Sequence, residues 1–161
     1  MSTRRETSRL PIRRAREPEA AVLSQIAFRA KASHGYDAAF MEACRAELTV
    51  APADFVRRVF WAAEDSDGQV VGFAGLWPAV DGVAEVDPLY VEPTLQRGGV
   101  GRLLWFELEA HARATGAERI VLDSDPHAVG FYERVGCRVI GEAPSGSIPG
   151  RMLPRMEKVL T

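Results

Sequence analysis

The segment from Val91 to Leu104 limits what this chain can fold into more than any other, because in it an apolar strand leads through a glycine-rich turn into an amphipathic helix. Gly98, Gly99 and Gly101 let the backbone turn tightly and approach a ligand closely, so that consecutive N–H groups can point at anionic oxygens. The first N–H groups of the helix also lack partners within it, and the positive end of the helix dipole lies there. The segment therefore predicts a phosphate site that would fit a pyrophosphate.

The residues around these glycines argue against two common nucleotide-binding loops. A nucleotide-hydrolysing P-loop requires a lysine and a hydroxyl residue after its last glycine, and neither follows here. A dinucleotide-binding turn has the pattern Gly-x-Gly-x-x-Gly, but Leu104 occupies the third glycine position when the count starts at Gly99. The remaining pattern, Gln96-x-x-Gly99-x-Gly101 after a strand, resembles the acetyl-CoA pyrophosphate loop of the GNAT superfamily of N-acetyltransferases.

A second segment carries the same resemblance. In the superfamily, a strand is followed by a helix that contains Asn-x-x-Ala-x-x-Phe-Tyr and that ends before Gly-Phe. Residues 119–123 form a β-branched run that is typical of a buried strand, and the following Asp-Pro pair breaks it. Ala128, Phe131 and Tyr132 then fall at helical spacing, and a glycine ends the helix. The two segments lie in the expected order.

Two positions of the second segment depart from the superfamily pattern. Asp125 replaces the usual asparagine, and a carboxylate accepts hydrogen bonds but donates none unless it is protonated. A donor bond from this side chain to the pantetheine arm of the cofactor would therefore be lost. Cys137 stands where an aromatic residue is more common, and an unpaired cysteine packs as a small hydrophobic residue. The resemblance covers roughly residues 83–141.

The resemblance implies a GNAT-like fold of the α/β (α+β) class, a mixed and mostly antiparallel sheet with a splayed central pair of parallel strands, flanked by helices. A chain of 161 residues can build one such core and is too short for two ordinary domains. We therefore expect a single N-acetyltransferase domain over residues 10–161. The polar residues 1–9 before it are expected to be a disordered tail.

The composition narrows the classes of partner. Apolar residues make up 47% of the chain, but no apolar run is long enough to cross a bilayer, so we expect no membrane partner and a cytoplasmic location. The net charge of −2 argues against a general nucleic-acid binder. Cys44 and Cys137 show no paired metal spacing, so we expect reduced thiols and no metal. Strand exchange or pairing of sheet edges would allow a homodimer.

Apolar periodicity and turn residues predict the remaining elements. Pro18 begins one helix, and Asp37 caps a second helix that ends at about Leu48. Between them, the loop with His34 and Tyr36 commonly borders the acceptor cleft in proteins of this resemblance; these side chains are low-ranking substrate contacts or solvent-exposed loop residues. The other elements are a weak strand over 10–14, a hairpin of 56–64 and 69–77, a strand over 83–91, a loop over 141–150 and a last strand over 156–160.

Pro88 lies inside the strand over residues 83–91, although proline donates no ladder hydrogen bond and is rare in central strands. The fold that this chain resembles splays this strand from its parallel neighbour, and a missing N–H is tolerated where the ladder opens. The resemblance places the pantetheine arm in that opening. Its amides would bond to the strand backbone, as an added strand does at a sheet edge.

The resemblance implies acetyl-CoA as the co-substrate. The N–H of Leu89 would stabilise the oxyanion, Val91 would hold pantetheine, and the amides of the glycine turn would hold the pyrophosphate. The guanidinium groups of Arg97 and Arg102 can add charge-assisted bonds to the phosphates. The cofactor-binding residues implied in this way are Leu89, Tyr90, Val91, Gln96, Arg97, Gly98, Gly99, Val100, Gly101, Arg102, Asp125, Ala128 and Tyr132.

Acetyl transfer to an amine requires a base, because alkyl amines resemble lysine, whose pKa is about 10.4. Glu85 precedes the glycine turn in the position of the catalytic glutamate of the superfamily's histone-acetylating branch, and it would act directly or through a water. Asp87 shares its strand face by the two-residue period, and a bulge near Pro88 would exchange their exposure. We favour Glu85 as base; Asp87 is the alternative or a substrate contact, and both carboxylates could instead be surface residues.

Tyr132 stands where the superfamily's general acid usually stands. Its phenol is protonated at neutral pH and can donate to the departing coenzyme A thiolate, while Phe131 packs inward. Adjacent aromatic residues in a helix are otherwise most often core residues. His111 and His127 are poorer candidates, since one lies in the middle of a helix and the other at a helix start.

These observations predict an acyltransferase that moves acetyl from acetyl-CoA to a primary amine by direct attack, with a general base and a general acid. A small-molecule amine is preferred, because no strongly basic or acidic recognition stretch suggests a macromolecular acceptor. A protein lysine or N-terminus is the alternative acceptor. A non-catalytic acyl-CoA-binding regulatory protein and a nucleotide-binding module are readings of different classes.

Overall fold

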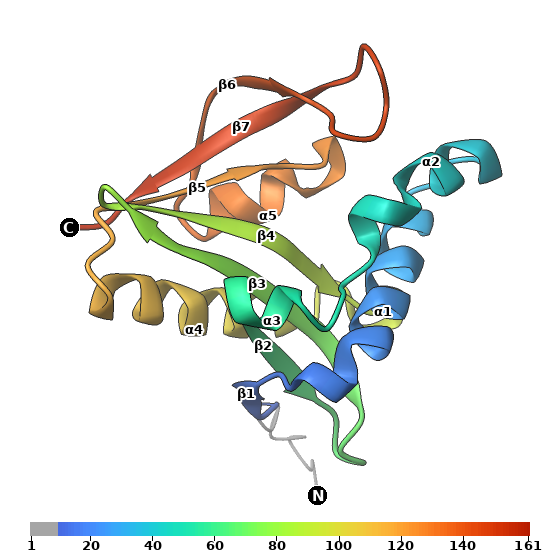
Figure 1. Cartoon of the computed structure of the whole chain (residues 1–161), viewed down its shortest axis with the longest axis horizontal. Helices are drawn as coiled ribbons and strands as arrows, with labels where there is room; N and C mark the ends of the chain where they lie inside the picture. The colour runs from blue at the N-terminus through green and yellow to red at the C-terminus, as the bar shows by residue number, and fades with distance from the viewer. Residues whose placement is uncertain (1–9) are drawn as a thin grey trace, which may run out of the picture.

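A seven-stranded sheet in the order β1-β2-β3-β4-β5-β7-β6 forms the centre of the computed structural model, which describes residues 10–161 (Figure 1). Residues 1–9, the predicted tail, lie outside the described residues. Neighbouring strands are antiparallel except for β4 and β5, which confirms the predicted fold class. The strands are β1 (Ile12–Arg14), β2 (Val59–Glu64), β3 (Val70–Val80), β4 (Val83–Val91), β5 (Arg119–Asp123), β6 (Arg138–Pro144) and β7 (Met152–Val159).

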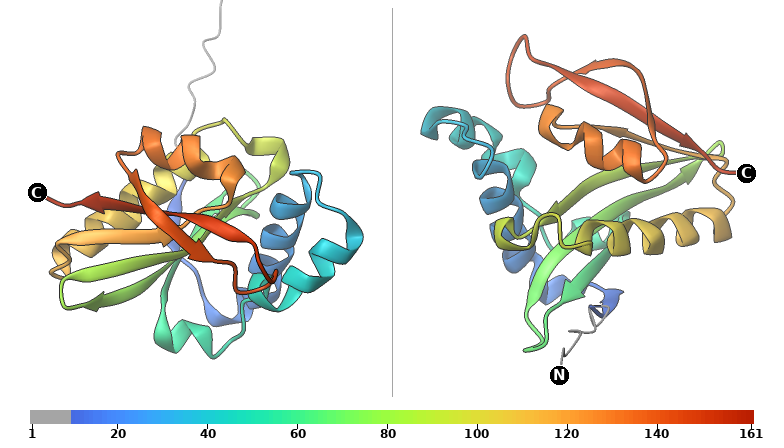
Figure 2. Two further views of the ribbon diagram at one scale, coloured as in Figure 1. Left: turned by 90° about the horizontal axis from the view of Figure 1, so that it is seen from above. Right: turned by 180° about the vertical axis from the view of Figure 1, so that it is seen from behind.

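Helices cover both faces of the sheet (Figure 2). The long helix α4 and the short α5 pack on one face, and α1 and α2 pack on the other. The buried residues of α4 recur at positions 100, 104, 105, 108 and 112, so a single stripe of the helix faces the strands. The helices are α1 (Ala20–Ala32), α2 (Ala38–Leu48), α3 (Asp54–Arg57), α4 (Val100–Ala114) and α5 (Val129–Arg134), with single 3-10 turns η1 (Glu17–Glu19), η2 (Pro93–Leu95) and η3 (Pro126–Ala128).

Two apolar cores result from this layering. Under α4, the fully buried Trp105 and Leu108 pack with Ile120 of β5. Under α1 and α2, Leu23 and Phe73 are fully buried. Because each core joins helices to several strands, the sheet holds the starts of α4 and α5 next to β4, where the predicted site lies.

The parallel strands β4 and β5 separate partway along their length. Their ladder contains only the pairs from Val83 with Arg119 to Glu85 with Val121. On its other side, β4 carries a bulge at Asp87 and Pro88, since these two residues lie opposite the single Gly75 of β3. The splayed pair is thus confirmed, and Pro88 lies where the ladder has already opened.

Several element boundaries differ from the predictions. The predicted strand over 56–64 is wrong at its start, because Asp54 accepts from the Ala51 N–H and pairs with Arg58, which stabilises the helical turn α3. The predicted loop over 141–150 is wrong in its first part, because β6 pairs with β7 as far as Pro144. Likewise, β7 begins four residues earlier than predicted and β3 continues to Val80. The predicted cap is confirmed, since the Asp37 carboxylate accepts from the Phe40 N–H at 2.8 Å.

Gly75 offers a test of the bulge, because an added Cβ there would meet the Asp87 carbonyl oxygen at 2.5 Å and the Phe60 ring at 2.8 Å. We expect Gly75→Ala to lower the free energy of unfolding by about 1–3 kcal/mol, the usual cost of overpacking. Urea denaturation measures the effect. Gly141→Ala on β6 is the matched control, since nothing lies within 4 Å of its added Cβ, and should change stability by less than about 0.5 kcal/mol. Equal effects of both substitutions would contradict the tight packing at the bulge.

Candidate functional site

A cavity of about 750 Å³ lies between the second half of β4, the glycine turn, the end of α1 and the start of α5. It brings together most of the predicted cofactor-binding residues and the predicted contact His34. The predicted residues that do not line it are Glu85, Asp87, Tyr36, Gly98 and Val100. The lining residues predicted for cofactor binding are Leu89, Tyr90, Val91, Gln96, Arg97, Gly99, Gly101, Arg102, Asp125, Ala128 and Tyr132.

The glycine turn presents a row of free backbone donors. Arg97 and Gly99 have positive φ angles of 70° and 86°, and this alternation points successive N–H groups toward one side. Within residues 10–161, the N–H groups of Gln96 and Gly98 donate to carbonyls of the preceding 3-10 turn. The hydrogen bonds of this part of the chain use neither the N–H groups of Arg97 and Gly99 nor those of the first three residues of α4. Five donors are therefore available to a ligand.

Gly101 is the point where α4 approaches the opposite wall of the cavity. An added Cβ at this position would meet the Phe131 ring at 3.1 Å and the Leu89 side chain at 3.7 Å. Glycine at this position thus lets the helix start, β4 and α5 lie in contact around one space. The predicted need for glycine has a specific packing reason here.

Backbone groups of β4 also point into the opening beside β5. The N–H of Glu92 donates to the carbonyl of Val71 on β3. Alternate residues of an antiparallel strand direct their N–H groups to the same neighbour, so Tyr90 also faces β3 while Leu89 and Val91 face the opening. These two residues are the ones for which the sequence predicts contacts with the carrier arm and the oxyanion.

Tyr132 lies at the inner wall of the cavity with 6% of its surface exposed. Its ring packs edge-on against Trp105 and Phe131, at centroid distances of 6.0 and 5.1 Å. Burial raises the pKa of the Tyr132 phenol far above its ordinary value, so the hydroxyl remains a proton donor at neutral pH. Phe131 is partly buried against the core, in agreement with its predicted packing.

Asp125 lines the cavity, but protein donors engage its carboxylate. Tyr36 donates to it at 2.8 Å, Lys31 at 3.3 Å, and His127 donates from both its backbone N–H and its ring. Burial alone would raise the pKa of Asp125, but these bonds and the Lys31 charge lower it well below its ordinary value. The carboxylate is therefore ionised and serves the protein's own contacts. Burial and the bond to Asp125 raise the pKa of Tyr36 to about 12.

The two candidate bases lie on the face of β4 opposite Val86, outside the cavity lining. The Glu85 side chain, which is 42% exposed, lies 3.5 Å from Arg155. The Asp87 side chain is 53% exposed and accepts from the Trp77 indole at 3.3 Å. Trp77 is the cross-strand partner of Glu85, and its indole also donates to Asp87. Glu85 and Asp87 therefore share this strand face, as predicted.

Several lining residues were not predicted from the sequence. The sequence places His127 at a helix start as a poor candidate acid, yet its ring lines the cavity and stacks on His34 with centroids 4.6 Å apart. Arg134 lies two residues after Tyr132, and its guanidinium folds back to within 3.3 Å of an added Cβ at Gly130. Arg134 follows Phe131 by three residues, so the helical period of α5 predicts that both side chains lie on the same face of the helix. The unpredicted lining residues are Ala30, Leu95, His127, Gly130, Phe131, Arg134 and Val135.

Residues 10–161 lack two further kinds of feature. No group of three or more His, Cys, Asp and Glu side chains in this range could hold a metal ion. Within the same part of the chain, no helix is both long and apolar enough to span a bilayer.

Comparison with known proteins finds relatives along most of the chain. Residues 26–137 match the profile of the family described as the acetyltransferase (GNAT) family. The peptidyl-lysine N-acetyltransferase YjaB of Salmonella typhimurium is 31% identical over 134 residues, which is 82% of this chain and 86% of that protein. Other curated relatives are matched over only 54% and 42% of their own length, so the chain spans about half of them.

Solved structures share the fold. A GCN5-related N-acetyltransferase from Rhodopseudomonas palustris superposes with a TM-score of 0.77 and 26% identity, covering 95% of this chain and 97% of that chain. The PaiA N-acetyltransferase from Thermoplasma acidophilum, solved in complex with coenzyme A, superposes with a TM-score of 0.73 and 20% identity over 94% of this chain and 99% of that chain. The order of strands and the helices around them therefore follow a known architecture.

Proposed function

The chain belongs to the acetyltransferase (GNAT) family, and from this premise we propose that it transfers an acetyl group from acetyl-CoA to a primary amine. The observation that carries the proposal is the row of free N–H groups at the glycine turn, which opens into a cavity that reaches Leu89 and Tyr132. Such a row suits a diphosphate, and the opening beside β4 suits an extended thioester arm.

The charges around the cavity fit the proposed co-substrate. Arg97, Arg102 and Arg134 line it, and within the described residues none of the three forms an ion pair. Among residues 10–161, Asp125 is the one carboxylate that lines the cavity, and it is already bonded to protein donors. An excess of guanidinium groups favours a ligand with several phosphates, because arginine binds phosphate through charge-assisted bonds.

In the proposed reaction, the amine nitrogen forms a bond to the thioester carbonyl carbon, and the carbon–sulfur bond then breaks. The Leu89 N–H is proposed to stabilise the oxyanion, because it faces the opening and is fixed by the β3–β4 ladder. Tyr132 is proposed to give its proton to the departing sulfur. The proton lost by the amine goes to the base, and no covalent intermediate with the enzyme is required.

Glu85 remains the proposed base, because it lies on β4 just before the bulge. It would act through a water, because it lies outside the cavity lining. We expect Glu85→Gln to lower kcat/KM by about 10- to 100-fold at neutral pH, since positioned bases contribute about 100-fold or more. The loss should shrink at higher pH, where more of the free amine is already uncharged. Initial rates across a pH series measure this.

Asp87→Asn is the matched variant for the base, since Asp87 shares the strand face of Glu85 and is also exposed. It should leave kcat/KM within about threefold of the parent if Glu85 is the base. A large loss with Asp87→Asn and none with Glu85→Gln would assign the base to Asp87. No loss with either variant would show that both are surface carboxylates.

We propose a small-molecule amine as the acceptor. The loop between β6 and β7 is tied to α2 by a bond between Ser147 and Glu47, and to the α1–α2 loop by Arg151, which donates to Tyr36 at 2.7 Å. We propose that the acceptor reaches the splayed strands beside these bridges, where a slender amine would pass more easily than a folded protein surface. A peptide lysine is the second candidate, because the relative that matches 82% of the chain is named a peptidyl-lysine N-acetyltransferase.

The proposal is tested by calorimetry with coenzyme A and by thiol release from acetyl-CoA across a panel of amines. The panel contains polyamines, aromatic ethylamines, amino sugars and a lysine-containing peptide. We expect micromolar coenzyme A affinity and turnover with at least one small amine. Turnover with the peptide alone would move the acceptor to protein lysine, and tight binding without any turnover would favour a regulatory acyl-CoA-binding protein. Absence of coenzyme A binding by folded protein would overturn the proposal.

A further inference from the structure

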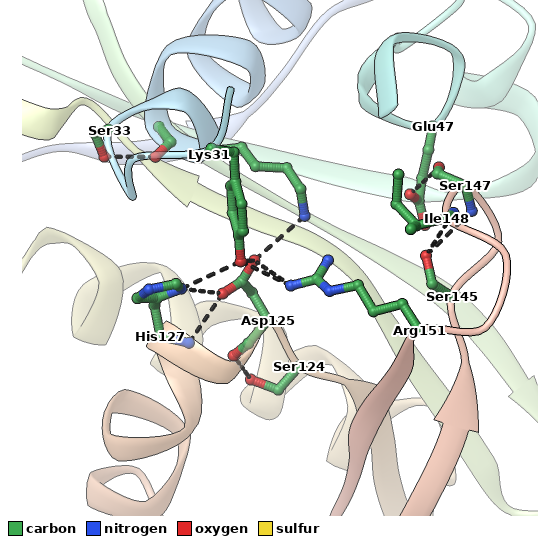
Figure 3. Close-up of polar contacts among 12 residues, drawn as sticks. Lys31, Ser33, Glu47, Ser124, Asp125, His127, Ser145, Ser147, Ile148 and Arg151 are labelled. Carbon is green, nitrogen blue, oxygen red and sulfur yellow. Dashed lines mark hydrogen bonds and ion pairs between the residues drawn. The ribbon is translucent and has the colours of Figure 1, made fainter. Parts of the chain in front are cut away.

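The Asp125 carboxylate joins segments that are far apart in the sequence (Figure 3). One oxygen accepts from the His127 backbone at 2.9 Å and from the His127 ring at 2.8 Å. The other accepts from Tyr36 of the α1–α2 loop at 2.8 Å and from Lys31 near the end of α1 at 3.3 Å. Arg151, in the loop between β6 and β7, lies 3.6 Å from the same oxygen. One carboxylate thus meets donors from three parts of the chain.

Tyr36 and Arg151 extend these contacts beyond a single ion pair. Arg151 donates to the Tyr36 hydroxyl at 2.7 Å, and its guanidinium lies 4.9 Å from the centre of the Phe40 ring. The Tyr36 and Phe40 rings stack with centroids 4.1 Å apart. The α1–α2 loop and the β6–β7 loop are therefore in direct contact, and both contact the Asp125 carboxylate, which itself lines the cavity.

Charge makes the contact dependent on an ionised carboxylate. Lys31 is only 7% exposed and the Arg151 side chain is 18% exposed, so two cations share the single charge of Asp125. The other titratable groups near the Asp125 carboxylate are His127 and the His34 ring that stacks on it. Glu47 on α2 bonds to Ser147 of the β6–β7 loop. An asparagine at this position would keep one acceptor oxygen but would leave both cations without their counter-ion.

We infer that Asp125 is a positioning residue whose carboxylate holds the α1–α2 loop and the β6–β7 loop against the wall of the cavity. The inference rests on the proposed function for its consequence, since these loops border the side from which the amine would arrive. Asp125 acts through Tyr36 and Arg151 and does not itself contact the reacting atoms. The aspartate that departs from the superfamily pattern thereby has a role in this chain's own loops.

Hydrogen exchange with mass spectrometry tests the inference without knowledge of the acceptor. In Asp125→Asn, we expect amide exchange in residues 33–37 and 145–151 to become at least tenfold faster, while exchange in α4 stays within twofold of the parent. Calorimetry should show a coenzyme A affinity within threefold of the parent. The control is Glu42→Gln, which removes the exposed partner of Arg45 on α2 and should leave exchange in both segments unchanged.

A double variant separates positioning from simple charge balance. In Asp125→Asn with Lys31→Met, the buried cation that lost its partner is also removed, so thermal stability should recover. If Asp125 positions the loops, the fast exchange in both segments persists in the double variant. If Asp125 is only the counter-ion of Lys31, slow exchange returns, and the inference is overturned. Unchanged exchange in Asp125→Asn, or faster exchange throughout the chain, overturns it as well.

Kinetics add a readout that a loss of folded protein would not produce. With the amine that the parent acetylates, Asp125→Asn should raise the KM for the amine at least tenfold and leave the KM for acetyl-CoA within threefold. A fall in kcat without a change in the KM for either substrate would contradict positioning. If the parent binds no coenzyme A, the proposed function fails, while the exchange experiment still decides whether Asp125 holds the loops.

Discussion

Replacing Gly101 with valine is expected to lower the affinity for coenzyme A at least 100-fold, which corresponds to about 2.7 kcal/mol of binding free energy. An added Cβ at Gly101 already meets the Phe131 ring at 3.1 Å, and the two methyl groups of valine enlarge the conflict. They would push α5 away or fill the space in front of the free N–H groups of the helix start. Because backbone donors bind only a ligand that comes close, either result removes the diphosphate contact. Calorimetry with coenzyme A measures the loss.

The same substitution at Gly141 is the control, since this glycine lies on β6 with nothing within 4 Å of an added Cβ. Gly141→Val should bind coenzyme A within twofold of the parent. Acetyl-pantetheine, which lacks the diphosphate, adds a second comparison, because its weak binding should suffer far less from Gly101→Val than that of acetyl-CoA. A folded Gly101→Val protein with full coenzyme A affinity would show that the glycine turn does not hold the cofactor.

The glycine turn could be predicted because its cause is local. Gly99 adopts a positive φ angle at the start of α4, and the N–H groups of Gln96 and Gly98 each bond to a carbonyl three residues earlier. The bounds of β4 were predictable for the same reason, and Pro88 indicated where the parallel ladder opens. These local patterns carried the resemblance to the superfamily, and that resemblance predicted the fold class and named most of the residues that line the cavity.

The contacts of Asp125 could not be predicted, because their cause lies far away in the sequence. Tyr36 and Lys31 are 89 and 94 positions from it, and no local pattern indicates that they meet. The pairing of Glu85 with Arg155 spans 70 positions and depends on the order in which β4, β5 and β7 join the sheet. The sequence also suggested surface loop residues as one interpretation of His34 and Tyr36, but both are partly buried at the Asp125 contact.

Replacing Tyr132 with phenylalanine is expected to lower kcat about 100-fold, the usual contribution of a positioned proton donor, with the KM for acetyl-CoA within threefold. Phenylalanine keeps the ring that packs against Trp105 and Phe131, so the fold should be preserved and only the proton is lost. Burial raises the pKa of Tyr132, so its protonated form persists throughout an assay between about pH 6 and 9. The parent kcat should therefore show no alkaline decline from this group.

Tyr90→Phe is the matched control for this last prediction, because Tyr90 also lines the cavity and burial also raises its pKa. Tyr90 packs near Phe73 on the other face of the sheet, so loss of its hydroxyl should leave kcat within threefold of the parent. The difference between the two variants then isolates the proton of Tyr132 from the general effect of removing a buried phenol. If Tyr132→Phe keeps more than half of the parent kcat, the sulfur leaves without a proton from Tyr132, and the pair Phe131-Tyr132 serves packing alone.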